Sequence, residues 1–325
     1  MSVLVTGAAG LIGSQIVRTL LDRGEDVVAL DRMLHTGRLD DLMSDGKITA
    51  MEADVTDLKN LEPIIRGNGV ERIIHTAAIL PPTSEEQPHL SYEVNIGGTN
   101  NVFEAAYRND VKRVVYPSSI ATYGDQSDHG DAVLDEESMQ RPFSLYGVAK
   151  LANEFAARAY TRNTGLDCRG LRICTVFGHG RLTGRSAAAS AMISTAAIGD
   201  GYLCPVTPEQ TSAYIYIDDV AEYMVQLAFS EALPRDIYCA SAHRISLDGI
   251  ADEIRALLPG ADITFAPGAT GFEQINRQSG ARLEADLGYR VRSMQERIRN
   301  QINVARRERQ MPELLNQMPE LLNKS

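Results

Sequence analysis

The segment SLYGVAK places Tyr146 and Lys150 four residues apart. On a helix this spacing brings the two side chains to one face. A tyrosine phenol has an ordinary pKa of about 10, so it is a poor base at neutral pH unless a nearby cation stabilises the phenolate. A lysine ammonium one turn away provides that cation, so the pair is a candidate for acid and base chemistry. The same spacing also occurs on ordinary helix surfaces, and the rest of the chain must decide between the two.

The glycine-rich segment VTGAAGLIGS near the N-terminus is a second candidate. Gly7, Gly10 and Gly13 lie between residues 3–6, which predict a buried strand, and residues 11–24, which predict a helix. Glycine permits a tight turn and close approach of the backbone, and a helix N-terminus offers free N–H groups to a pyrophosphate. Turn glycines that only allow close packing are the alternative. Because both the strand and the helix are predicted, we expect a dinucleotide-binding site.

An acidic residue ends the next predicted strand. Asp31 follows the glycines by about 20 residues, the distance at which a carboxylate reaches the ribose hydroxyls of adenosine. Its charge would repel a 2′-phosphate, so we expect NAD rather than NADP. Arg32, His35 and Arg38 lie nearby and weaken this preference, and a solvated aspartate at a strand end is the alternative.

Asp54 and Val55 follow the third predicted strand, where an adenine could rest. In the alternative interpretation Asp54 caps the next helix, and the sequence leaves both roles open.

Another predicted strand ends in the serines of YPSSIATYG. Serines at a strand end usually bond to the local backbone. In hydride transfer, however, a proton must move at a hydroxyl or carbonyl oxygen while the hydride moves at carbon, and a serine hydroxyl could hold that oxygen in place. The serines, the glycines and the Tyr–Lys pair together predict hydride-transfer chemistry.

Strand and helix patterns alternate through the first half of the chain, which predicts an α/β fold with a Rossmann-type, doubly wound parallel sheet. We expect an NAD-binding domain over 1–178, completed by about 214–240. The segments 179–213 and 241–309 are expected to form a smaller, interleaved α/β substrate lobe.

Residues 310–325 contain QMPELLN twice, and each copy could begin a short helix with proline at its first position. A partner-binding segment is one interpretation, but we favour a flexible or artificial tail and assign it no chemistry.

The composition excludes several classes of partner. The net charge of −11 disfavours nucleic acid, which binds to basic surfaces. The four cysteines show no metal-ligand spacing, so we expect reduced thiols and no metal site. Because a secretory leader and an apolar run of about 18 residues are both lacking, we expect a cytoplasmic protein without membrane contact.

Nine segments in order resemble the extended short-chain dehydrogenase/reductase family, of the NAD-dependent epimerase/dehydratase type. They are TGAAGLIGS, ALDR, ADVTD, IIHTAA, VNIGGTNNVFEAA, YPSSIATYGD, YGVAK, GLRICTVFG and YIYIDDVA, and they cover nearly the whole chain to about residue 309. The resemblance implies that Tyr146 is the catalytic acid/base and that Lys150 lowers its pKa and binds the nicotinamide ribose. It implies that Ser119, or otherwise Ser118, orients the reacting oxygen.

The resemblance further implies a cofactor cleft and a dimer. The residues implied for NAD are Gly7, Gly10, Leu11, Ile12, Gly13, Asp31, Arg32, Asp54, Val55, Thr76, Ala77, Ala78, Asn95, Pro117, Tyr146, Lys150 and Ile173. A homodimer would form through the helices predicted at about 89–109 and 144–163. Ordinary core burial of the same apolar faces is the alternative.

The chain departs from family members that act on sugar nucleotides. Their common asparagine is replaced by Thr175, and their Arg-Asp pair is replaced by Ser212 and Ala213. Arg277 or Arg282 could replace these groups, and the alternative is that both are ordinary surface arginines. These departures weaken a sugar-nucleotide assignment.

The segment after residue 180 resembles family members that oxidise small free substrates, namely L-threonine, uronate and erythronate-type dehydrogenases. Such a substrate, if carboxylated, needs a cation, for which Arg185 is our candidate and Arg181 the second. The segment 78–86, with Leu80, would form a wall of the pocket. Substrate contacts are therefore expected from Leu80, Ser118, Ser119, Thr175 and Arg185.

We therefore expect an NAD-dependent oxidoreductase that oxidises a secondary alcohol of a small polar substrate, with carboxylated and sugar-like substrates both left open. The alternative is a sugar-nucleotide epimerase or dehydratase similar to UDP-glucose 4-epimerase, an isomerase that regenerates NAD within its cycle. A non-catalytic NAD-sensing protein is disfavoured, because such relatives tend to lose the Tyr or the Lys.

Overall fold

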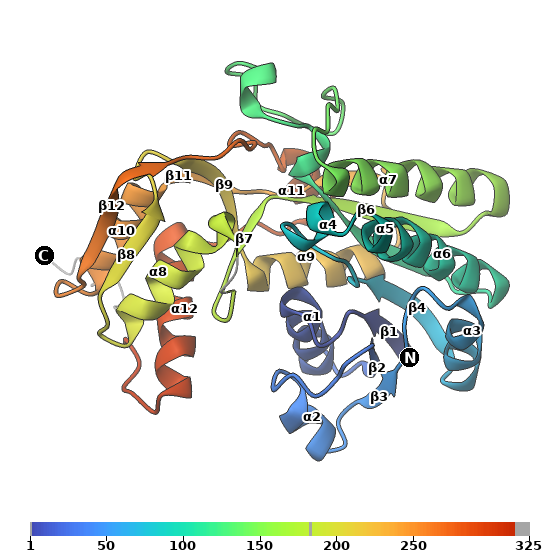
Figure 1. Cartoon of the computed structure of the whole chain (residues 1–325). Coiled ribbons are helices and arrows are strands. Elements are labelled where there is room, and N and C mark those ends of the chain that lie inside the picture. Colours follow the sequence, from blue (N-terminus) through green and yellow to red (C-terminus); the bar gives the residue numbers. More distant parts are fainter. Residues whose placement is uncertain (1, 182–183, 316–325) are drawn as a thin grey trace, which may run out of the picture. The chain divides into compact units, whose positions relative to one another are not determined.

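The computed structural model describes residues 2–181 and 184–315, which belong to two units (Figure 1). The first unit comprises Met1–Val176, Thr211–Arg244 and Glu273–Val291, and the second comprises Phe177–Gln210, Ile245–Phe272 and Arg292–Ser325. The chain passes between the units five times, three of them within or next to the short strands β7 (Thr175–Phe177), β9 (Thr211–Tyr216) and β11 (His243–Ser246). The predicted NAD residues and the Tyr–Lys pair all belong to the first unit.

A seven-stranded sheet forms the centre of the first unit, in the order β10-β6-β5-β4-β1-β2-β3. Its strands are β1 (Ser2–Thr6), β2 (Asp26–Asp31), β3 (Thr49–Glu52), β4 (Val70–His75), β5 (Arg113–Ser119), β6 (Asp167–Ile173) and β10 (Ile237–Cys239). All neighbouring pairs are parallel, so the carboxyl ends of the strands lie at one edge. The order reverses between β1 and β4, and ligands of open α/β sheets bind at such a switch point. The predicted Rossmann-type fold is confirmed.

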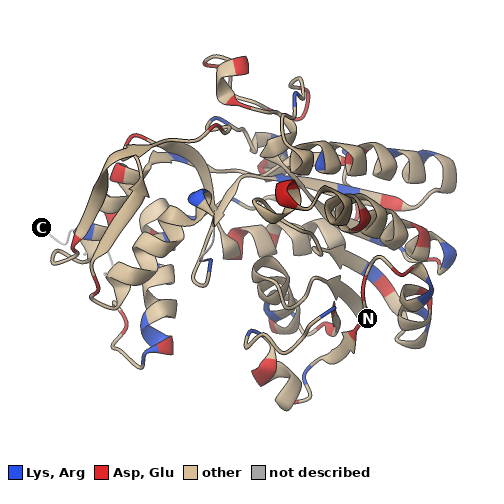
Figure 2. Cartoon of the chain, viewed as in Figure 1, with Lys and Arg blue, Asp and Glu red and all other residues tan. Residues whose placement is uncertain are grey.

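Helices cover the sheet and carry acidic and basic residues interspersed along them (Figures 1 and 2). The helices of the first unit are α1 (Leu11–Asp22), α2 (Asp40–Ser44), α3 (Leu58–Gly67), α4 (Thr83–Glu86), α5 (Pro88–Ser91), α6 (Thr99–Arg108), α7 (Leu145–Thr164), α9 (Ile217–Phe229) and α11 (Ala281–Leu287), with a π-helix η1 (Tyr92–Gly98) and the 3₁₀ turns η2 (Ile120–Thr122) and η3 (Gln126–Asp128). The helix predicted at 89–109 is therefore α5, η1 and α6 in succession.

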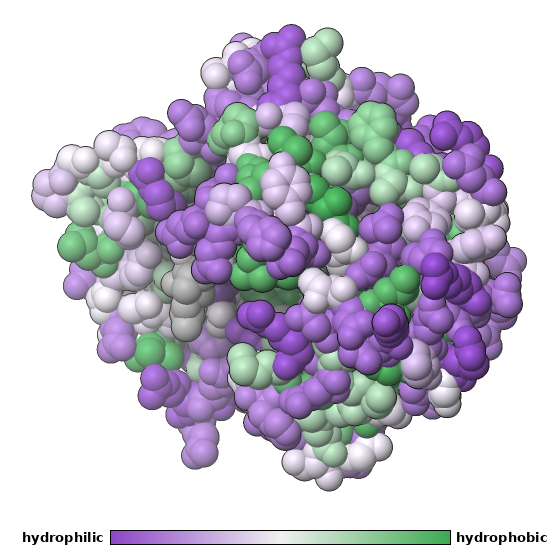
Figure 3. Space-filling view, turned by 45° about the vertical axis from the view of Figure 1, so that its right-hand side comes forward, coloured by the Kyte–Doolittle hydropathy of each residue, from purple (hydrophilic) through white to green (hydrophobic). Residues whose placement is uncertain are grey.

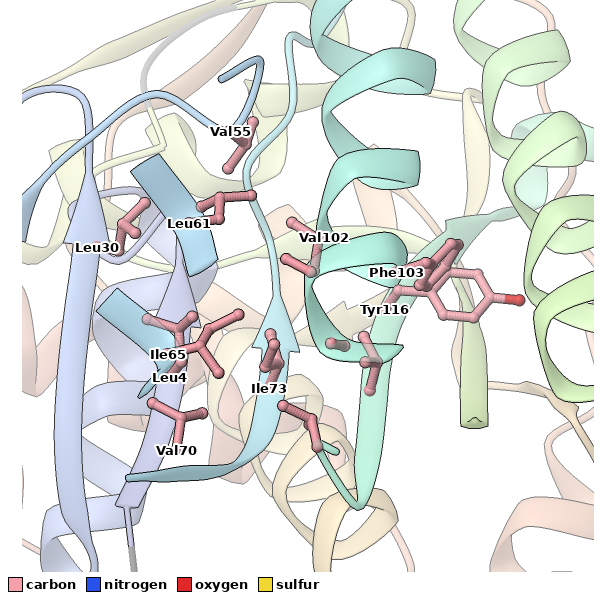
Figure 4. Packing of buried hydrophobic residues seen from close by; sticks show 14 of the residues in the cluster. Leu4, Leu30, Val55, Leu61, Ile65, Val70, Ile73, Val102, Phe103 and Tyr116 are labelled. Carbon is pink, nitrogen blue, oxygen red and sulfur yellow. The ribbon is translucent and has the colours of Figure 1, made fainter. Parts of the chain in front are cut away.

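The apolar core lies between the sheet and the helices α3 and α6 (Figure 4). Leu4 and Ile73 of the sheet face apolar side chains of the helices, among them Leu61. Phe103 of α6 packs edge-to-face on Tyr116, with ring centroids 5.4 Å apart. Burying one such side chain contributes about 1.5–3 kcal/mol, so this layer holds the helices firmly on the sheet.

The second unit contains a small parallel sheet, formed by β8 (Tyr202–Val206) and β12 (Ile263–Thr270). Its helices are the 3₁₀ turn η4 (Arg185–Ala187), α8 (Ala188–Ala197), α10 (Leu247–Leu257) and α12 (Met294–Glu308). Helix α12 packs against α8, where Gln301 donates to the backbone oxygen of Ser190 at 2.7 Å. Among all residues that the structure describes, no helix is long and apolar enough to cross a membrane.

The segment Glu273–Val291 belongs to the first unit, although the sequence pattern placed it in the smaller lobe. Gln278 donates to the backbone oxygens of Arg172 and Ala240 at 3.2 and 2.7 Å, which ties the segment to β6 and to the end of β10. Polar side-chain contacts of this kind leave no periodic signal in a sequence.

The first QMPELLN copy differs from the expected short helix. Residues 311–315 are not helical, and the Leu314 N–H donates instead to Asn303 Oδ1 of α12 at 2.7 Å. The second copy, 317–323, lies outside the residues that the structure describes.

A buried ion pair joins α7 to β6. Arg172 donates from Nε and Nη2 to the two carboxylate oxygens of Glu154, at 2.9 and 2.8 Å, and both side chains are at most 1% exposed. Ser118 also donates to Glu154, and Arg172 donates to the hydroxyl of Tyr123 at 2.7 Å. Burial would raise the pKa of Glu154, but the hydrogen bond and charge of Arg172 outweigh it and lower that pKa. Both groups are therefore charged in the interior.

Replacing one member of this pair should be costly. Glu154→Leu leaves the Arg172 guanidinium buried without its carboxylate, and we expect the free energy of unfolding to fall by about 3–5 kcal/mol in urea denaturation. Adding Arg172→Met should restore most of the loss. Arg108→Met, which removes an exposed partner of Glu104, is the control and should cost less than about 1 kcal/mol. A double variant no more stable than Glu154→Leu would contradict this account.

Candidate active site

The carboxyl edge of the sheet brings together three segments singled out in the sequence. Strands β1, β4 and β5 are adjacent: β1 and β4 lead directly into Gly7 and Thr76, and β5 ends at Ser119 (Figure 1). Parallel strands place these ends side by side, although the segments are about 40 to 70 residues apart in the chain. A cleft at this edge is lined by Gly7, Gly10, Leu30, Asp31, Arg32, Ala53, Asp54, Val55, Thr76, Ala77, Ala78, Ile79 and Val94.

The glycines bring α1 close to the strands. Gly7 has a φ of +68°, and a Cβ there would lie 2.5 Å from the backbone nitrogen of Ala77. A Cβ on Gly13 would lie 2.1 Å from the backbone oxygen of Gly7. Larger residues would therefore fill this turn. Helix α1 starts after Gly10 without a side-chain cap, so the N–H groups of Leu11, Ile12 and Gly13 are suited to a phosphate.

Asp31 is fixed at the end of β2 by backbone amides. Its carboxylate accepts from Ala9 N at 3.1 Å and from Met33 N at 3.3 Å. It lines the cleft beside Arg32, as a ribose-binding carboxylate would.

Asp54 also lines the cleft, but it does not cap the next helix. The cap of α3 is Asp57, which accepts from Lys59 N, whereas Asp54 accepts from Thr56. The capping alternative for Asp54 is therefore wrong.

Thr76 and Asn95 hold the backbone of the cleft. Thr76 donates to the backbone oxygen of Thr6 at 2.7 Å, which joins the ends of β4 and β1. Asn95, in the π-helix, accepts from Ile79 N at 2.7 Å and donates to Ile79 O at 2.9 Å. The side chain of Asn95 thus shapes the segment after β4.

Tyr146 and Lys150 lie in the first two turns of α7, which Ser144 caps by accepting from Gly147 N at 3.1 Å. Lys150 Nζ lies 5.5 Å from the centre of the Tyr146 ring and donates to the backbone oxygen of Pro117 at 2.9 Å. That bond ties the helix to β5, two residues before Ser119. Gly147 allows the close contact, since a Cβ there would lie 2.4 Å from the backbone oxygen of Ala121.

The electrostatics of the pair follow from burial. The Lys150 side chain is only 4% exposed, and burial lowers its pKa to about 8. Nearby His75 is also buried, and burial, followed by the charge of Lys150, lowers its pKa to about 3. His75 is therefore neutral at physiological pH, and Lys150 is the cation that can act on the Tyr146 phenol.

The two serines of β5 have different surroundings. Ser119 Oγ accepts from Ala121 N at 3.1 Å, which uses a lone pair, so the hydroxyl can still donate its hydrogen. Ser118 is 2% exposed and donates to Glu154 on the opposite side of the strand. The hydrogen bond from Ser118 to Glu154 favours Ser119 over Ser118 as the substrate-orienting serine.

Glu85 contacts the catalytic helix and was missed in the sequence. Its two carboxylate oxygens accept from Leu145 N and Tyr146 N, each at 3.0 Å. A carboxylate at a helix N-terminus is stabilised by the helix dipole, so Glu85 fixes the start of α7. The bond joins residues about 60 positions apart, and only the acidic segment TSEE could have suggested it.

The predicted substrate residues are distributed over both units. Leu80 is 57% exposed in the segment after β4, and Thr175 donates to Gln274 Oε1 at 3.3 Å in the first unit. Arg185 belongs to the second unit, where it bonds to Thr270 and stacks on Phe272.

The arginines considered as phosphate partners are held by acids. Arg277 pairs with Asp131 at 3.2 Å, and Arg282 pairs with Glu137 at 3.0 Å. These contacts favour the surface interpretation of both side chains.

Comparison with known proteins identifies relatives of this arrangement. Residues 3–239 match the model of the NAD dependent epimerase/dehydratase family. A putative UDP-glucose 4-epimerase of Methanocaldococcus jannaschii is 33% identical over 230 residues, which cover 68% of this chain and 71% of that protein. An uncharacterized epimerase/dehydratase of Staphylococcus haemolyticus is 26% identical over 265 residues, covering 79% and 81%.

Two solved structures share the fold. The Thermus thermophilus UDP-glucose 4-epimerase in complex with NAD has a TM-score of 0.81 and 28% identity, and the match covers 94% of this chain and 99% of that one. A GalE-like L-threonine dehydrogenase from Cupriavidus necator has a TM-score of 0.83 and 24% identity, covering 93% and 99%. These findings confirm the family resemblance seen in the sequence.

Burial of Lys150 should cost stability in a pH-dependent way. The folded protein binds this proton less tightly than the unfolded chain, with pKa values of about 8 and 10.5, so stability should rise with pH between them. Without NAD, we expect Lys150→Met to be more stable than the wild type below pH 8, by up to about 3 kcal/mol. The advantage should shrink toward pH 10.5 in urea denaturation.

Lys112→Met, which removes an exposed lysine, is the matched control. An advantage of Lys150→Met that stays constant from pH 7 to pH 10 would contradict the assignment of this cost to the buried charge.

Proposed function

Since the chain belongs to the NAD-dependent epimerase/dehydratase family, we propose that it oxidises a secondary alcohol of a small polar substrate. Its cofactor is NAD, and the chain is an enzyme of the dehydrogenase/epimerase type. The observation that carries the proposal is the burial of Lys150 between the Tyr146 ring and the backbone oxygen of Pro117 in β5, two residues before Ser119. The glycine turn, Asp31 and the cleft at the same edge fit a dinucleotide.

The chain's own residues manage the proton. NAD, when bound, supplies the acceptor for the hydride. The Ser119 hydroxyl donates a hydrogen bond to the substrate oxygen and orients it, while Tyr146 takes its proton. Lys150 favours the phenolate of Tyr146 by its charge, and Glu85 holds the backbone of Tyr146 in place.

Net oxidation is favoured by residues that differ from those of sugar-nucleotide enzymes. Thr175, Ser212 and Ala213 stand where such members carry an amide and an Arg-Asp pair. Arg277 and Arg282 are engaged with acids and are poor candidates for a diphosphate. We propose Arg185 as the partner of a carboxylate on the substrate, since a guanidinium can bind both of its oxygens.

Epimerisation of a sugar nucleotide is the second candidate. It is favoured by the relatives named UDP-glucose 4-epimerase, from Methanocaldococcus jannaschii and Thermus thermophilus. The same acid/base residues would serve it, with the hydride returned to the substrate.

We also propose that the protein is a homodimer. Tyr92 of η1, Tyr107 of α6, and Val148 and Phe155 of α7 are each at least 41% exposed, and Phe155 is 62% exposed. Apolar residues also gather at the surface in the view that turns this side of the molecule forward (Figure 3). Large exposed apolar groups on neighbouring helices are typical of a subunit interface.

Turnover distinguishes the two activities. With hydroxy acids, amino acids and sugars as candidate substrates, we expect the wild type to form NADH in a net reaction, which is measured by the absorbance of NADH. Tyr146→Phe should lower kcat by at least about 100-fold, because it removes the proton acceptor, and should leave NAD affinity unchanged.

Tyr107→Phe, which removes a hydroxyl from an exposed tyrosine on α6, is the control and should turn over normally. Wild-type turnover in Tyr146→Phe would remove the mechanism. Interconversion of UDP-glucose and UDP-galactose without net NADH would replace the proposed oxidation by epimerisation.

The dimer can be tested at Phe155. Phe155→Glu places a charge on the proposed interface and should produce a monomer by light scattering, while the far-UV circular dichroism stays that of the wild type. Leu203→Glu, at an exposed apolar residue of β8 that is 61% exposed, should leave the mass unchanged. A wild-type monomer, or a Phe155→Glu dimer, would contradict the proposal.

A further inference from the structure

Gln274 has a buried polar group that nothing in the described protein pairs. Its Oε1 accepts from the Thr175 hydroxyl at 3.3 Å, but its Nε2 is shielded and has no hydrogen-bond partner in the structure. An amide hydrogen that loses water without a replacement acceptor is unfavourable. An unpaired donor of this kind is a candidate for pairing with a group that is not part of the chain.

The contact with Thr175 places Gln274 just beyond the carboxyl end of β6, the strand that pairs with β5. In the register of β5 and β6, Ser119 lies opposite Ile173, and Thr175 follows Ile173 by two residues. Gln274 contacts Thr175, so its amide lies close to the carboxyl end of β6. All of these residues belong to the first unit.

Neighbouring contacts hold the Gln274 segment in place. Gln126 Oε1 accepts from Asn276 N and Arg277 N at 3.2 and 3.1 Å. Gln278 donates to the ends of β6 and β10, as described above. These hydrogen bonds involve residues two to four positions after Gln274. The backbone that follows Gln274 is therefore held by the sheet and by η3. A preorganised amide can bind a ligand without the cost of ordering a loop.

We propose that Gln274 is a specificity-determining residue whose Nε2 donates to an oxygen of the substrate, with Thr175 fixing the amide. The inference rests on the proposed oxidation of a small alcohol. The acceptor is a carboxylate or carbonyl oxygen close to the reacting carbon. A neutral amide donor suits one such oxygen and would leave an ammonium group unpaired.

A single amide donor at Gln274 also limits how much negative charge the bound part of the substrate can carry. A diphosphate carries more charge than one amide and one hydroxyl can balance, and buried charge needs paired charge or several hydrogen bonds. A single carboxylate is within that limit. Gln274 thus favours small carboxylated substrates over sugar nucleotides.

Binding to the protein–NADH complex tests the proposal directly. Isothermal titration calorimetry with L-threonine, D-galacturonate, D-erythronate and UDP-glucose measures each ligand on the wild type. Gln274→Leu should lower the affinity for the carboxylated ligand by about 10–100-fold, as expected for loss of a hydrogen bond to a charged group. Gln274→Glu, which retains the size but adds a negative charge, should weaken it further. Affinity for NADH should stay within about two-fold, since Gln274 is not in the cofactor cleft.

Two further variants separate recognition from folding. Thr175→Val should weaken the same ligand, because the amide loses its anchor, whereas Thr175→Ser should restore binding. Gln226→Leu, at a partly buried glutamine on α9, should bind all ligands as the wild type does.

The outcomes distinguish this inference from the proposed function. If a carboxylated ligand is bound and oxidised but Gln274→Leu binds it as the wild type does, the role of Gln274 is overturned and the oxidation stands. If UDP-glucose alone binds and Gln274→Leu weakens it, Gln274 is a substrate ligand but the carboxylate class and the proposed oxidation both fail. If no carboxylated ligand binds to the wild type, the carboxylate assignment is overturned.

Discussion

The ion pair between Glu154 and Arg172 is the constraint on which the geometry of the site depends. It fixes α7 against β6 in the interior, where two opposite charges must stay in hydrogen-bond contact to offset their loss of water. Glu154 is one turn beyond Lys150, which is one turn beyond Tyr146, so the register that satisfies the ion pair also places the acid/base residues. A helix rotated or shifted by one residue would bury an unpaired charge.

Strand β5 transmits this constraint to the reacting oxygen. Ser118 and Ser119 are consecutive in an extended strand, so their side chains point to opposite sides. Ser118 donates to Glu154 of the ion pair, and Lys150 donates to the backbone oxygen of Pro117, so both contacts join β5 to α7 just before Ser119. The cost of burying Lys150 is thus met by packing and hydrogen bonds elsewhere in α7 and β5. Its lowered pKa is a consequence of the same burial that brings its charge close to the Tyr146 ring.

The sequence predicted those features that depend on local pattern. The glycine turn, the parallel strands and the Tyr–Lys spacing arise from backbone sterics and hydrophobic periodicity, and these are local properties. The contacts of Glu85 with the start of α7, and the packing of Glu273–Val291 with the first unit, join residues far apart in the chain. They depend on hydrogen bonds that leave no periodic pattern in the sequence. Ser118 and Ser119 could not be ranked from residue types alone, because the choice follows from which side of β5 faces Glu154.

Substrate specificity depends on polar groups at the carboxyl edge of the sheet. The acid/base residues are equally suited to net oxidation and to epimerisation, because both begin with loss of a proton and a hydride from an alcohol. Discrimination must come from groups that bind the remainder of the substrate, and a buried unpaired donor discriminates strongly, since a ligand without a matching acceptor leaves it unpaired. Thr175 follows the end of β6 by two residues and donates to Gln274, and the ion pair of Arg172 with Glu154 ties β6 to α7. The specificity role that we propose for Gln274 would therefore depend on the same strand that holds the proposed acid/base residues of α7 in place.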